Sequence, residues 1–414
     1  SKYLTVYIMK HLFTLLALTI SFSMNAQYWF SGTATNAIQT ATNTASGSYS
    51  TAMGGDTTAS GYGSTAMGNL TEANGTASTA MGANTFATGA SSTAMGNGTI
   101  AIGTASTAMG YYTIASADYS TAMGRSTTAS GISSTAMGES TKASADYSTA
   151  MGRSTIAVGR YSTAMGFETT ASGDFSTAMG RDTEALGTYS TAMGNTTEAS
   201  GFSSTAMGYG TTASGAYSTA MGVFTSASDY GSLVIGKYNS AGSIENNGTS
   251  FSLENTAFVI GRGENADARL DAFKVMFNGD TTVSNDLTVE GDIVISSDAR
   301  LKANIVSLGA TLAKLLLIDG KRYTMKKDGK QKIGVLAQDI QKVFPELVST
   351  DDRDMLAVNY QGLVPVLINA LKEQDGKMKE QDGKMKEQQS EIDELKKQEK
   401  RLERLEAIIS NMDK

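Results

Sequence analysis

The sequence of 414 residues contains no cysteine, one histidine and two prolines, and aromatic residues make up only 7% of it. Without cysteine, disulfide bonds, thiol nucleophiles and thiolate metal sites are excluded. The single histidine, His11, lies in a segment that we expect to be removed, which also excludes histidine-dependent triads, dyads and the usual zinc sites. A formal net charge of −7 gives no basic surface for nucleic acid. We therefore predict no metal, no small-molecule cofactor and no nucleic-acid partner.

The first 26 residues have the pattern of a secretory signal peptide. Met9 is the expected start, Lys10 supplies the positive charge, residues 12–22 form the apolar run, and we place cleavage after Ala26. The alternative is a membrane anchor, since about 20 apolar residues span a bilayer. Lys10 and His11 interrupt the apolar stretch, which disfavours the anchor. We therefore predict a protein that is secreted or held at the cell surface.

A short repeat dominates the sequence that follows. The pentapeptide Ser-Thr-Ala-Met-Gly recurs every 14 residues from Ser50 to Gly222, and residues 233–236 continue its phase as a degenerate last copy. A fixed period without insertions predicts one structural coil per copy. Each copy contains two short alternating runs separated by glycine-containing corners, so we predict two strands per coil, stacked in parallel on the neighbouring coils.

The repeat also predicts which side chains face inward. Because side chains alternate along a strand, Thr and Met face one side and Ser and Ala face the other. Leu233 and Ile235 replace Thr and Met in the degenerate copy, so we predict that the Thr and Met face is buried. We expect the small Ala and Ser side chains to let another subunit approach, because a thin roll has little interior of its own.

The repeat resembles the head domain of trimeric autotransporter adhesins, whose Ser-x-Ala-Ile-Gly repeats form a left-handed parallel β-roll packed as a trimer. The match is carried by copies such as Ser64 to Gly68, in which Met67 stands in place of isoleucine. The resemblance covers about half of the chain. It implies a trimeric, left-handed parallel β-roll.

A partial rank of aromatic residues occupies one phase of the repeat. The rank could contact sugars, or it could cover the roll and stabilise adjacent coils, which is the interpretation that we favour. Threonine columns at the same period leave an ice-binding solenoid as a further alternative. The aromatic rank consists of Tyr49, Tyr119, Tyr147, Tyr161, Phe175, Tyr189 and Tyr217.

The composition becomes charged after residue 296, and three segments there resemble the C-terminal intramolecular chaperone of phage tail spikes and endosialidases. The first is the Ser-Asp-x-Arg-Leu-Lys motif of residues 297–302. The second is Ile-Gly-Val-Leu-Ala-Gln-Asp from Ile333, which continues to Leu347, and the third is Ala-Val-Asn-Tyr from Ala357. The resemblance implies a small domain that drives trimer assembly.

This family cuts its own chain with a Ser-Lys dyad, and Ser297 and Lys302 keep the family's spacing of five residues. The resemblance implies that Ser297 is the nucleophile and Lys302 its base, with Asp298 and Arg300 as supporting residues of the motif. A lysine can act as a base only when burial lowers its pKa, and we expect trimer assembly to supply that burial. The alternative is a turn serine beside a solvated lysine that does not cleave. Any enzymatic activity is thus one self-directed cut.

A heptad pattern occupies the last part of the chain and predicts a three-stranded coiled coil. Two glycines, Gly376 and Gly383, fall on its outer face, where they weaken the helix. One seam position holds Leu371, Met378, Met385 and Ile392, and the other holds Gln374, Gln381, Gln388, Leu395, Leu402 and Ile409.

These patterns together predict a mainly β protein: a trimeric left-handed parallel β-roll solenoid, a small α+β chaperone domain and a trimeric coiled coil. The predicted function is that of an exported, adhesin-like homotrimeric fibre, with a cell-surface or carbohydrate receptor as an open partner. A phage tail fibre or tail spike is an alternative, although export argues against it, and an ice-binding or carbohydrate-binding solenoid is another. The predicted parts are a signal peptide (1–26), an N-terminal cap (27–49), the β-roll (50–236), a β-rich connector (237–296), the chaperone (297–370) and the coiled coil (371–414).

Overall fold

The computed structural model describes residues 30–412 apart from 33, 41, 241–246, 327 and 351–353. The chain divides into two compact units, residues 1–288 and 289–414, which are described separately. The predicted signal peptide lies outside the described residues. Among the residues that are described, no helix is long and apolar enough to cross a membrane.

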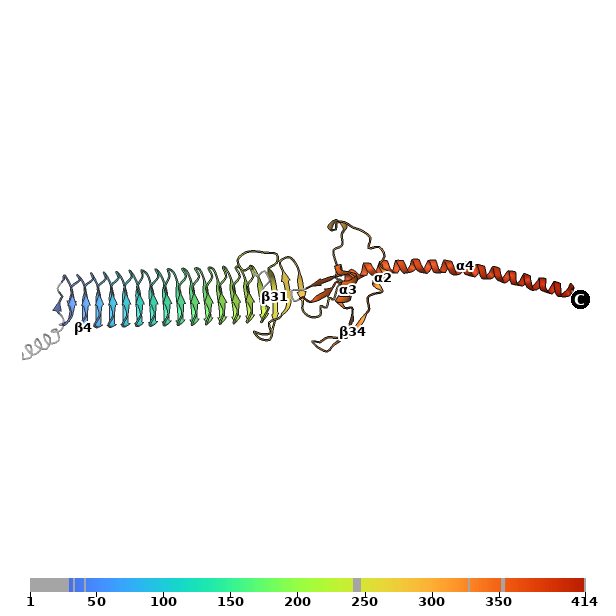
Figure 1. Cartoon of the computed structure of the whole chain (residues 1–414). Helices are drawn as coiled ribbons and strands as arrows, with labels where there is room; N and C mark the ends of the chain where they lie inside the picture. Colours follow the sequence, from blue (N-terminus) through green and yellow to red (C-terminus); the bar gives the residue numbers. More distant parts are fainter. Residues whose placement is uncertain are drawn as a thin grey trace, which may run out of the picture. The chain divides into compact units, whose positions relative to one another are not determined.

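The first unit is a β-solenoid in which each 14-residue copy forms one coil (Figure 1). A coil contains one strand of five residues and one of two, and equivalent strands pair in parallel. Met95 thus lies beside Met109 in the long-strand sheet, and Ile100 lies beside Ile114 in the short-strand sheet. The predicted period, strand content and mainly β fold class are confirmed.

The strands of the solenoid repeat with little variation. The long strands are β4 (Thr51–Gly55), β6 (Thr65–Asn69), β8 (Thr79–Ala83), β10 (Thr93–Asn97), β12 (Thr107–Tyr111), β14 (Thr121–Arg125), β16 (Thr135–Glu139), β18 (Thr149–Arg153), β20 (Thr163–Phe167), β22 (Thr177–Arg181), β24 (Thr191–Asn195), β26 (Thr205–Tyr209), β28 (Thr219–Val223) and β30 (Leu233–Lys237). The short strands are β3 (Thr44–Ala45), β5 (Thr58–Ala59), β7 (Glu72–Ala73), β9 (Phe86–Ala87), β11 (Ile100–Ala101), β13 (Ile114–Ala115), β15 (Thr128–Ala129), β17 (Lys142–Ala143), β19 (Ile156–Ala157), β21 (Thr170–Ala171), β23 (Glu184–Ala185), β25 (Glu198–Ala199), β27 (Thr212–Ala213) and β29 (Ser226–Ala227).

The interior of the solenoid is built from the small side chains, so the predicted orientation of the strands is wrong. Ser106 and Ala108 are fully buried, whereas Met109 is only half-buried on the outer face of the long-strand sheet. Two thin sheets leave room between them only for alanine, serine and threonine side chains. Leu233, which continues the threonine rank, is 37% exposed and therefore marks the outer face as well.

The glycine after each methionine is required by the stacking of the coils. At Gly110 the backbone has φ +126°, which favours glycine, and an added Cβ would lie 2.0 Å from the carbonyl oxygen of Gly124. Any side chain there would push two neighbouring coils apart. The constancy of glycine in this position of the repeat follows from that close approach.

Both ends of the solenoid are closed by strands that break the repeat. At the first end, β1 (Phe30–Ser31) pairs antiparallel with β2 (Ile38–Gln39), and β2 pairs in parallel with β4. At the other end, β31 (Thr256–Arg262) follows β30 in parallel, and β32 (Asp271–Met276) and β33 (Thr281–Val283) continue antiparallel. Much of the predicted connector therefore extends the long-strand sheet, and both terminal coils have their exposed edges paired.

Asparagine occupies both ends of the buried threonine column. Asn43 Oδ1 accepts a hydrogen bond from the Thr57 backbone N–H at 2.9 Å. Asn239 Oδ1 accepts from the Ser226 N–H at 2.8 Å, and its Nδ2 donates to the Ser226 carbonyl at 2.9 Å. These two side chains are nearly buried. Each amide supplies the hydrogen bonds that a further coil would otherwise make.

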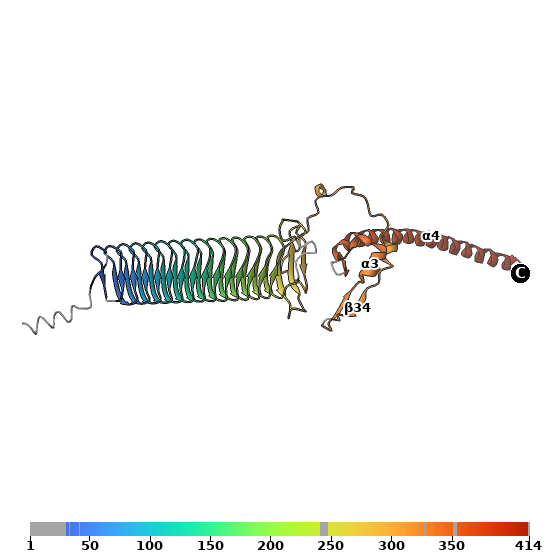
Figure 2. The same cartoon turned by 60° about the vertical axis from the view of Figure 1, so that its left-hand side comes forward.

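The second unit has a small core formed by α2 (Leu312–Leu315), α3 (Ala337–Val343), strands β36 (Val348–Thr350) and β37 (Leu356–Val358), and the start of the long helix α4 (Leu363–Met412) (Figure 2). Ile340 of α3 is fully buried and packs with Phe344 and with Val366 of α4. Glu373 of α4 accepts a hydrogen bond from the Leu312 N–H at 3.1 Å, at the beginning of α2. The elements are η1 (Ala299–Leu301), α2 (Leu312–Leu315), β34 (Lys321–Thr324), β35 (Gln331–Gly334), α3 (Ala337–Val343), η2 (Pro345–Leu347), β36 (Val348–Thr350), β37 (Leu356–Val358), η3 (Tyr360–Gly362) and α4 (Leu363–Met412).

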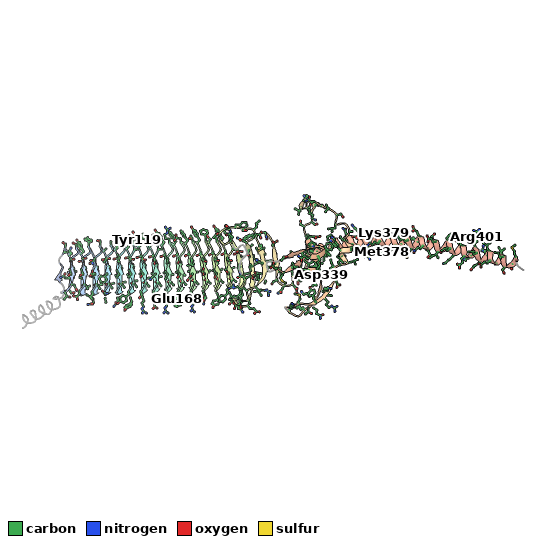
Figure 3. All side chains as sticks on the ribbon, in the orientation of Figure 1. Tyr119, Glu168, Asp339, Met378, Lys379 and Arg401 are labelled. Atoms are coloured by element: carbon green, nitrogen blue, oxygen red, sulfur yellow. The ribbon has the colours of Figure 1, made fainter. Side chains whose placement is uncertain are left out.

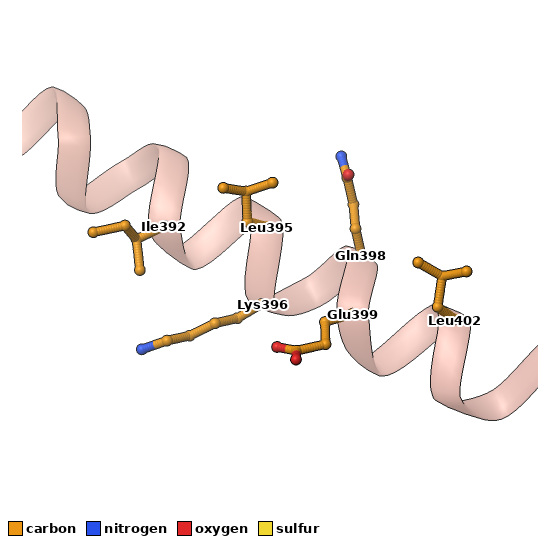
Figure 4. A pocket seen from close by; sticks show the side chains of 6 residues that line it. All are labelled: Ile392, Leu395, Lys396, Gln398, Glu399 and Leu402. Carbon is orange, nitrogen blue, oxygen red and sulfur yellow. The ribbon is translucent and has the colours of Figure 1, made fainter.

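The helix α4 is continuous through the region predicted as a coiled coil. Its side chains are exposed from residue 374 to residue 412. A shallow apolar groove along it is lined by Ile392, Leu395 and Leu402, among others. Figure 4 shows Leu395 and Leu402, seven residues apart, projecting from the same side of the helix. An uncovered apolar seam with this spacing fits the packing of further helices.

Candidate self-cleavage site

The first chaperone motif forms a tight turn that joins two side chains five residues apart. The single 3-10 turn η1 lies between Ser297 and Lys302. Across it, Lys302 Nζ donates a hydrogen bond to Ser297 Oγ at 2.6 Å. The two atoms lie within the distance needed for a nucleophile and its base, and a neutral lysine there would accept the hydroxyl proton instead of donating. The structure therefore brings the two predicted catalytic residues together.

Asp298 and Arg300, which lie between Ser297 and Lys302 in the sequence, stabilise this turn by contacting each other. The Asp298 carboxylate accepts hydrogen bonds from the Arg300 backbone N–H at 2.8 Å and from its guanidinium at 2.8 and 3.1 Å. The guanidinium contact first, and the backbone contact second, hold the pKa of Asp298 below its usual value. The same ion pair raises the pKa of Arg300. Asp298 thus remains ionised and caps the turn that positions Ser297 and Lys302.

The dyad lies in a stretch that a single chain leaves uncovered. Every residue from 284 to 310 is exposed, and the stretch includes large apolar side chains such as Val294 and Val306, which are 88% and 84% exposed. Ser297 and Lys302 share this exposure. A run of uncovered apolar side chains on this scale is typical of a surface that becomes buried in an assembly.

The other two chaperone motifs meet each other. Tyr360, from the third motif, accepts a hydrogen bond at its hydroxyl from the Val335 backbone N–H at 3.2 Å. The adjacent Gly334 has no room for a side chain, since an added Cβ would lie 2.7 Å from that hydroxyl oxygen. The first motif remains apart from this pair, in the exposed stretch of residues 284–310.

The outer face of the long-strand sheet is a second candidate surface, and the sequence interpretation assigned it to the wrong side. The rank of methionines leads to Ile235, which pairs with Ile260, and Ile260 pairs in turn with Phe273. These three side chains are half-buried in the single chain. One apolar stripe thus follows the outer face from the repeat into β31 and β32. In the sequence, the large apolar side chains of this stripe were the available signal that its residues point away from the thin interior of the roll.

The predicted aromatic rank is confirmed as one structural position. Each of its members has a left-handed backbone conformation, with φ near +60°, at a corner of the coil. The rings of Tyr147, Tyr161, Phe175 and Tyr189 are stacked, with centroids 4.7 to 5.0 Å apart. Tyr119 of this rank and Glu168 of the second corner project from opposite edges of the solenoid (Figure 3). The threonine column beginning at Thr57 is buried, which removes it from any contact with an ice lattice.

Metal-binding geometry is absent from the part of the chain that the structure describes. Within residues 30–412, apart from the gaps given above, no three carboxylate, histidine or cysteine side chains converge. The dyad is the one arrangement there that we interpret as reactive.

Comparison with protein families separates the same two parts of the chain. The model described as YadA head domain repeat matches residues 45–71, 73–99, 101–127, 129–155, 157–183, 175–197, 185–211, 199–225 and 213–239. The model described as Chaperone of endosialidase matches residues 297–349. Residues between 45 and 239 are thus similar to YadA head repeats, and residues 297–349 are similar to an endosialidase chaperone. A comparison with curated proteins gave no match.

The two family matches correspond to the predicted resemblances. The endosialidase-type chaperone match begins at Ser297 and includes Lys302 and the second motif. The YadA head repeats end at residue 239, beside the degenerate last coil. Repeats of this adhesin type are found in proteins that are secreted or exposed at the cell surface.

Proposed function

We propose that this protein is an exported, homotrimeric, adhesin-like fibre whose chaperone domain directs assembly and then cuts itself from the fibre. The observation that carries the proposal is the 2.6 Å contact between Lys302 Nζ and Ser297 Oγ within an exposed apolar stretch. The Lys302 and Ser297 side chains are already in contact, whereas the residues around them are still exposed, as in an unassembled chain. Activity would therefore depend on assembly.

Two uncovered surfaces support the trimer. The first is the outer stripe of the solenoid, in which Met109 stands between equivalent methionines of the neighbouring coils. The second is the exposed seam of α4 that includes Leu395 and Leu402. Each surface runs along its own element, so parallel copies could cover each of them. A thin roll whose interior is mostly alanine, serine and threonine gains much of its apolar burial in this way.

The proposed cut follows from the roles of the two residues. Lys302, once neutral in an assembled and desolvated site, accepts the hydroxyl proton as Ser297 Oγ attacks an adjacent peptide carbonyl. The carbon–nitrogen bond breaks, the departing amine takes the proton, and the acyl group remains on Oγ as an ester. Water then hydrolyses the ester and restores Ser297. Asp298 and Arg300 position the turn throughout.

The remaining assignments are also proposals. We infer a signal peptide that is removed after Ala26, an N-terminal cap at 27–49, a roll at 50–236, a connector at 237–296, a chaperone at 297–370 and a coiled coil at 371–414. An attachment fibre of a phage would share the chaperone and the trimer. The apolar run of residues 12–22 favours an exported protein over a virion component.

Mass spectrometry of the purified assembled protein tests the proposal. We expect a mature N-terminus at Gln27, a trimeric fibre that ends beside Ser297, and a separate fragment that contains α4. A stable monomer under the same conditions would contradict the trimer. A trimer that stays intact after prolonged incubation would contradict self-cleavage and leave the domain as a permanent cap.

A further inference from the structure

The aromatic rank is not required by the solenoid fold. At its corner position Tyr147 has φ +59°, a conformation that is unfavourable for a bulky residue. Other coils place Ser133 or Ala105 at the same position with nearly the same φ. Because small residues also form the corner, the fold does not require the rings, which leaves them available for a further role.

The ring stack has a regular spacing and one interruption. Centroids are 4.7 Å apart between Tyr147 and Tyr161, and the two rings are inclined by only 4°. On the other side of Tyr147 the next coil carries Ser133, and the coil beyond it carries Tyr119. Strand spacing places those two tyrosines about 9.6 Å apart along the solenoid. This distance is twice the ring spacing, which leaves the thickness of one ring between them.

The structure contains a filled example of the same interruption. Ser203 separates Tyr189 from Tyr217, and the neighbouring Phe202 places its ring between them. The Phe202 centroid lies 5.7 Å from that of Tyr189 and 5.4 Å from that of Tyr217, and its plane is inclined by 82° and 74° to theirs, an edge-on arrangement. A six-membered ring is therefore accommodated between two rank members that are two coils apart.

At Ser133 the corresponding neighbour is Ile132, which carries no ring. The Ile132 side chain is shorter than a phenylalanine side chain. The space between Tyr119 and Tyr147 that lies farthest from the backbone is therefore not filled by a ring. Tyr119 is 62% exposed, compared with 51% for Tyr147, whose other face is covered by Tyr161. Tyr161, which has rings on both faces, is 50% exposed, so the 62% exposure of Tyr119 shows ring surface that no neighbouring ring covers.

The two coils that flank the interruption are copies of each other. Residues 115–127 and 143–155 have the same sequence, Ala-Ser-Ala-Asp-Tyr-Ser-Thr-Ala-Met-Gly-Arg-Ser-Thr. Each tyrosine is thus preceded by an aspartate. Asp118 accepts a hydrogen bond from the Thr104 N–H at 2.7 Å, and Asp146 accepts one from the Ile132 N–H at 2.9 Å. The Asp146 contact fixes that carboxylate beside the interruption, whereas the Asp118 contact holds its carboxylate toward the preceding coil, away from Ser133.

We propose that this interruption binds one pyranose ring of a neutral glycan between Tyr119 and Tyr147. A pyranose with equatorial hydroxyls has two apolar C–H faces, which pack on aromatic rings by dispersion and burial of apolar surface. Its hydroxyls lie at the rim of the ring and can donate to the Asp146 carboxylate. The negative charge of Asp146 opposes an anionic sugar, and a carboxylate suits a hydroxylated ring better than an aromatic side chain of a protein partner.

The site is built within one chain and does not depend on self-cleavage, so it can fail or succeed independently of the proposed function. The probes are cellotriose, N,N′,N″-triacetylchitotriose and β-1,4-galactotriose, titrated calorimetrically into the full-length protein. We expect at least one of them to bind. Ser133→Tyr, which completes the stack with a residue that the rank already uses, should abolish binding. Tyr119→Ala and Asp146→Asn should each weaken binding about tenfold.

The matched control is Ser126→Tyr, which adds a tyrosine at the other corner, where φ is also +54°. This variant should bind the trisaccharide as the wild type does. The proposal is overturned if none of the three probes binds the wild type at millimolar concentration, if Ser133→Tyr binds as tightly as the wild type, or if both tyrosine variants lose binding equally. Circular dichroism establishes that each variant keeps its solenoid.

Discussion

Lys302 Nζ and Ser297 Oγ are 2.6 Å apart in a single chain although both side chains are exposed. Local sequence therefore sets the alignment of the dyad, because a six-residue motif closes the turn by itself. The assembled state would change the surroundings of the dyad and leave its geometry in place. Alignment without burial explains how a chain could carry its own cutting site through synthesis and folding without premature cleavage.

Removing either member of the dyad should abolish the cut without affecting assembly. Ser297→Ala removes the attacking oxygen, and Lys302→Arg replaces the base with a guanidinium that stays protonated. Gel electrophoresis under denaturing conditions should show the uncut chain, and light scattering should still give a trimer. Ser296→Ala and Lys342→Arg are the controls and should cut normally. Full cleavage of the Ser297→Ala trimer would exclude this serine as the nucleophile.

The ion pair between Asp298 and Arg300 should also affect cleavage, through the shape of the turn. Because the pKa of Asp298 is lowered in the folded turn, its stabilising contribution is present above the unfolded-state pKa and is lost as pH falls through the folded value. Arg300→Ala should return this pKa toward the usual value of 3.8. Since exposed ion pairs contribute little, the cleavage rate should fall only about twofold to fivefold.

Carboxyl NMR titration and a cleavage time course measure the two effects of Arg300→Ala. Arg322→Ala is the control, since no contact between Arg322 and the turn is expected and both readouts should stay unchanged. An unchanged Asp298 pKa in the Arg300 variant would show that the guanidinium does not hold the carboxylate in solution.

Neighbouring residues of one long strand should respond in opposite ways to a charge. Ala108 is fully buried inside the roll, so Ala108→Asp should cost several kcal/mol and unfold the coils around it. Met109 is on the outer face, so Met109→Asp should leave the single-chain solenoid folded but prevent association. Circular dichroism reports the first effect and light scattering the second. A Met109→Asp protein of unchanged trimeric mass would mean that the outer face is not the interface.

The period, the strand pairs and the proximity of Ser297 and Lys302 were predictable because each depends on local sequence. The inward face was not, because alternation in the repeat shows that two faces differ but not how far apart the sheets lie. Only the thickness of the roll decides that Ala108 is inside and Met109 outside. The ring of Phe202 was also missed, since it stands one residue away from the phase of the aromatic rank.

Asn43, at the first end of the threonine column, should stabilise that end in a way that a threonine cannot. Asn43→Thr extends the column but removes the acceptor for the Thr57 N–H and the Nδ2 donor to the Gly54 carbonyl. Each loss should cost about 1 kcal/mol locally. Hydrogen exchange at the Thr57 amide should become faster, whereas coils in the middle stay protected. Thr127→Val, in mid-column, is the control and should change stability little, because the Thr127 hydroxyl has no hydrogen-bond partner in the structure.

Two glycines in α4 should limit the stability of the coiled coil. Gly376 and Gly383 lie within the helix, and an added Cβ at either would meet nothing within 4 Å. Alanine should therefore stabilise the helix by about 1 kcal/mol per substitution, because glycine loses more backbone entropy on folding. Both positions are on the outer face of the heptad pattern, so the seam and the number of strands should not change. Thermal melting followed at 222 nm should show a higher midpoint for the double variant.

The same substitution at Gly362 should have the opposite sign and provides the control for the helix prediction. There an added Cβ would lie 2.4 Å from Leu347 Cδ2, so Gly362→Ala forces this side chain, which packs against the chaperone core, to move. A rise in melting temperature for the α4 variants together with a fall for Gly362→Ala would separate helix propensity from packing. If the α4 variants instead melt earlier, or associate with a different number of chains, the glycines must contact another chain in the assembly. They would then belong to the interface, and the heptad register given by Leu371 and Met378 would have to be rotated.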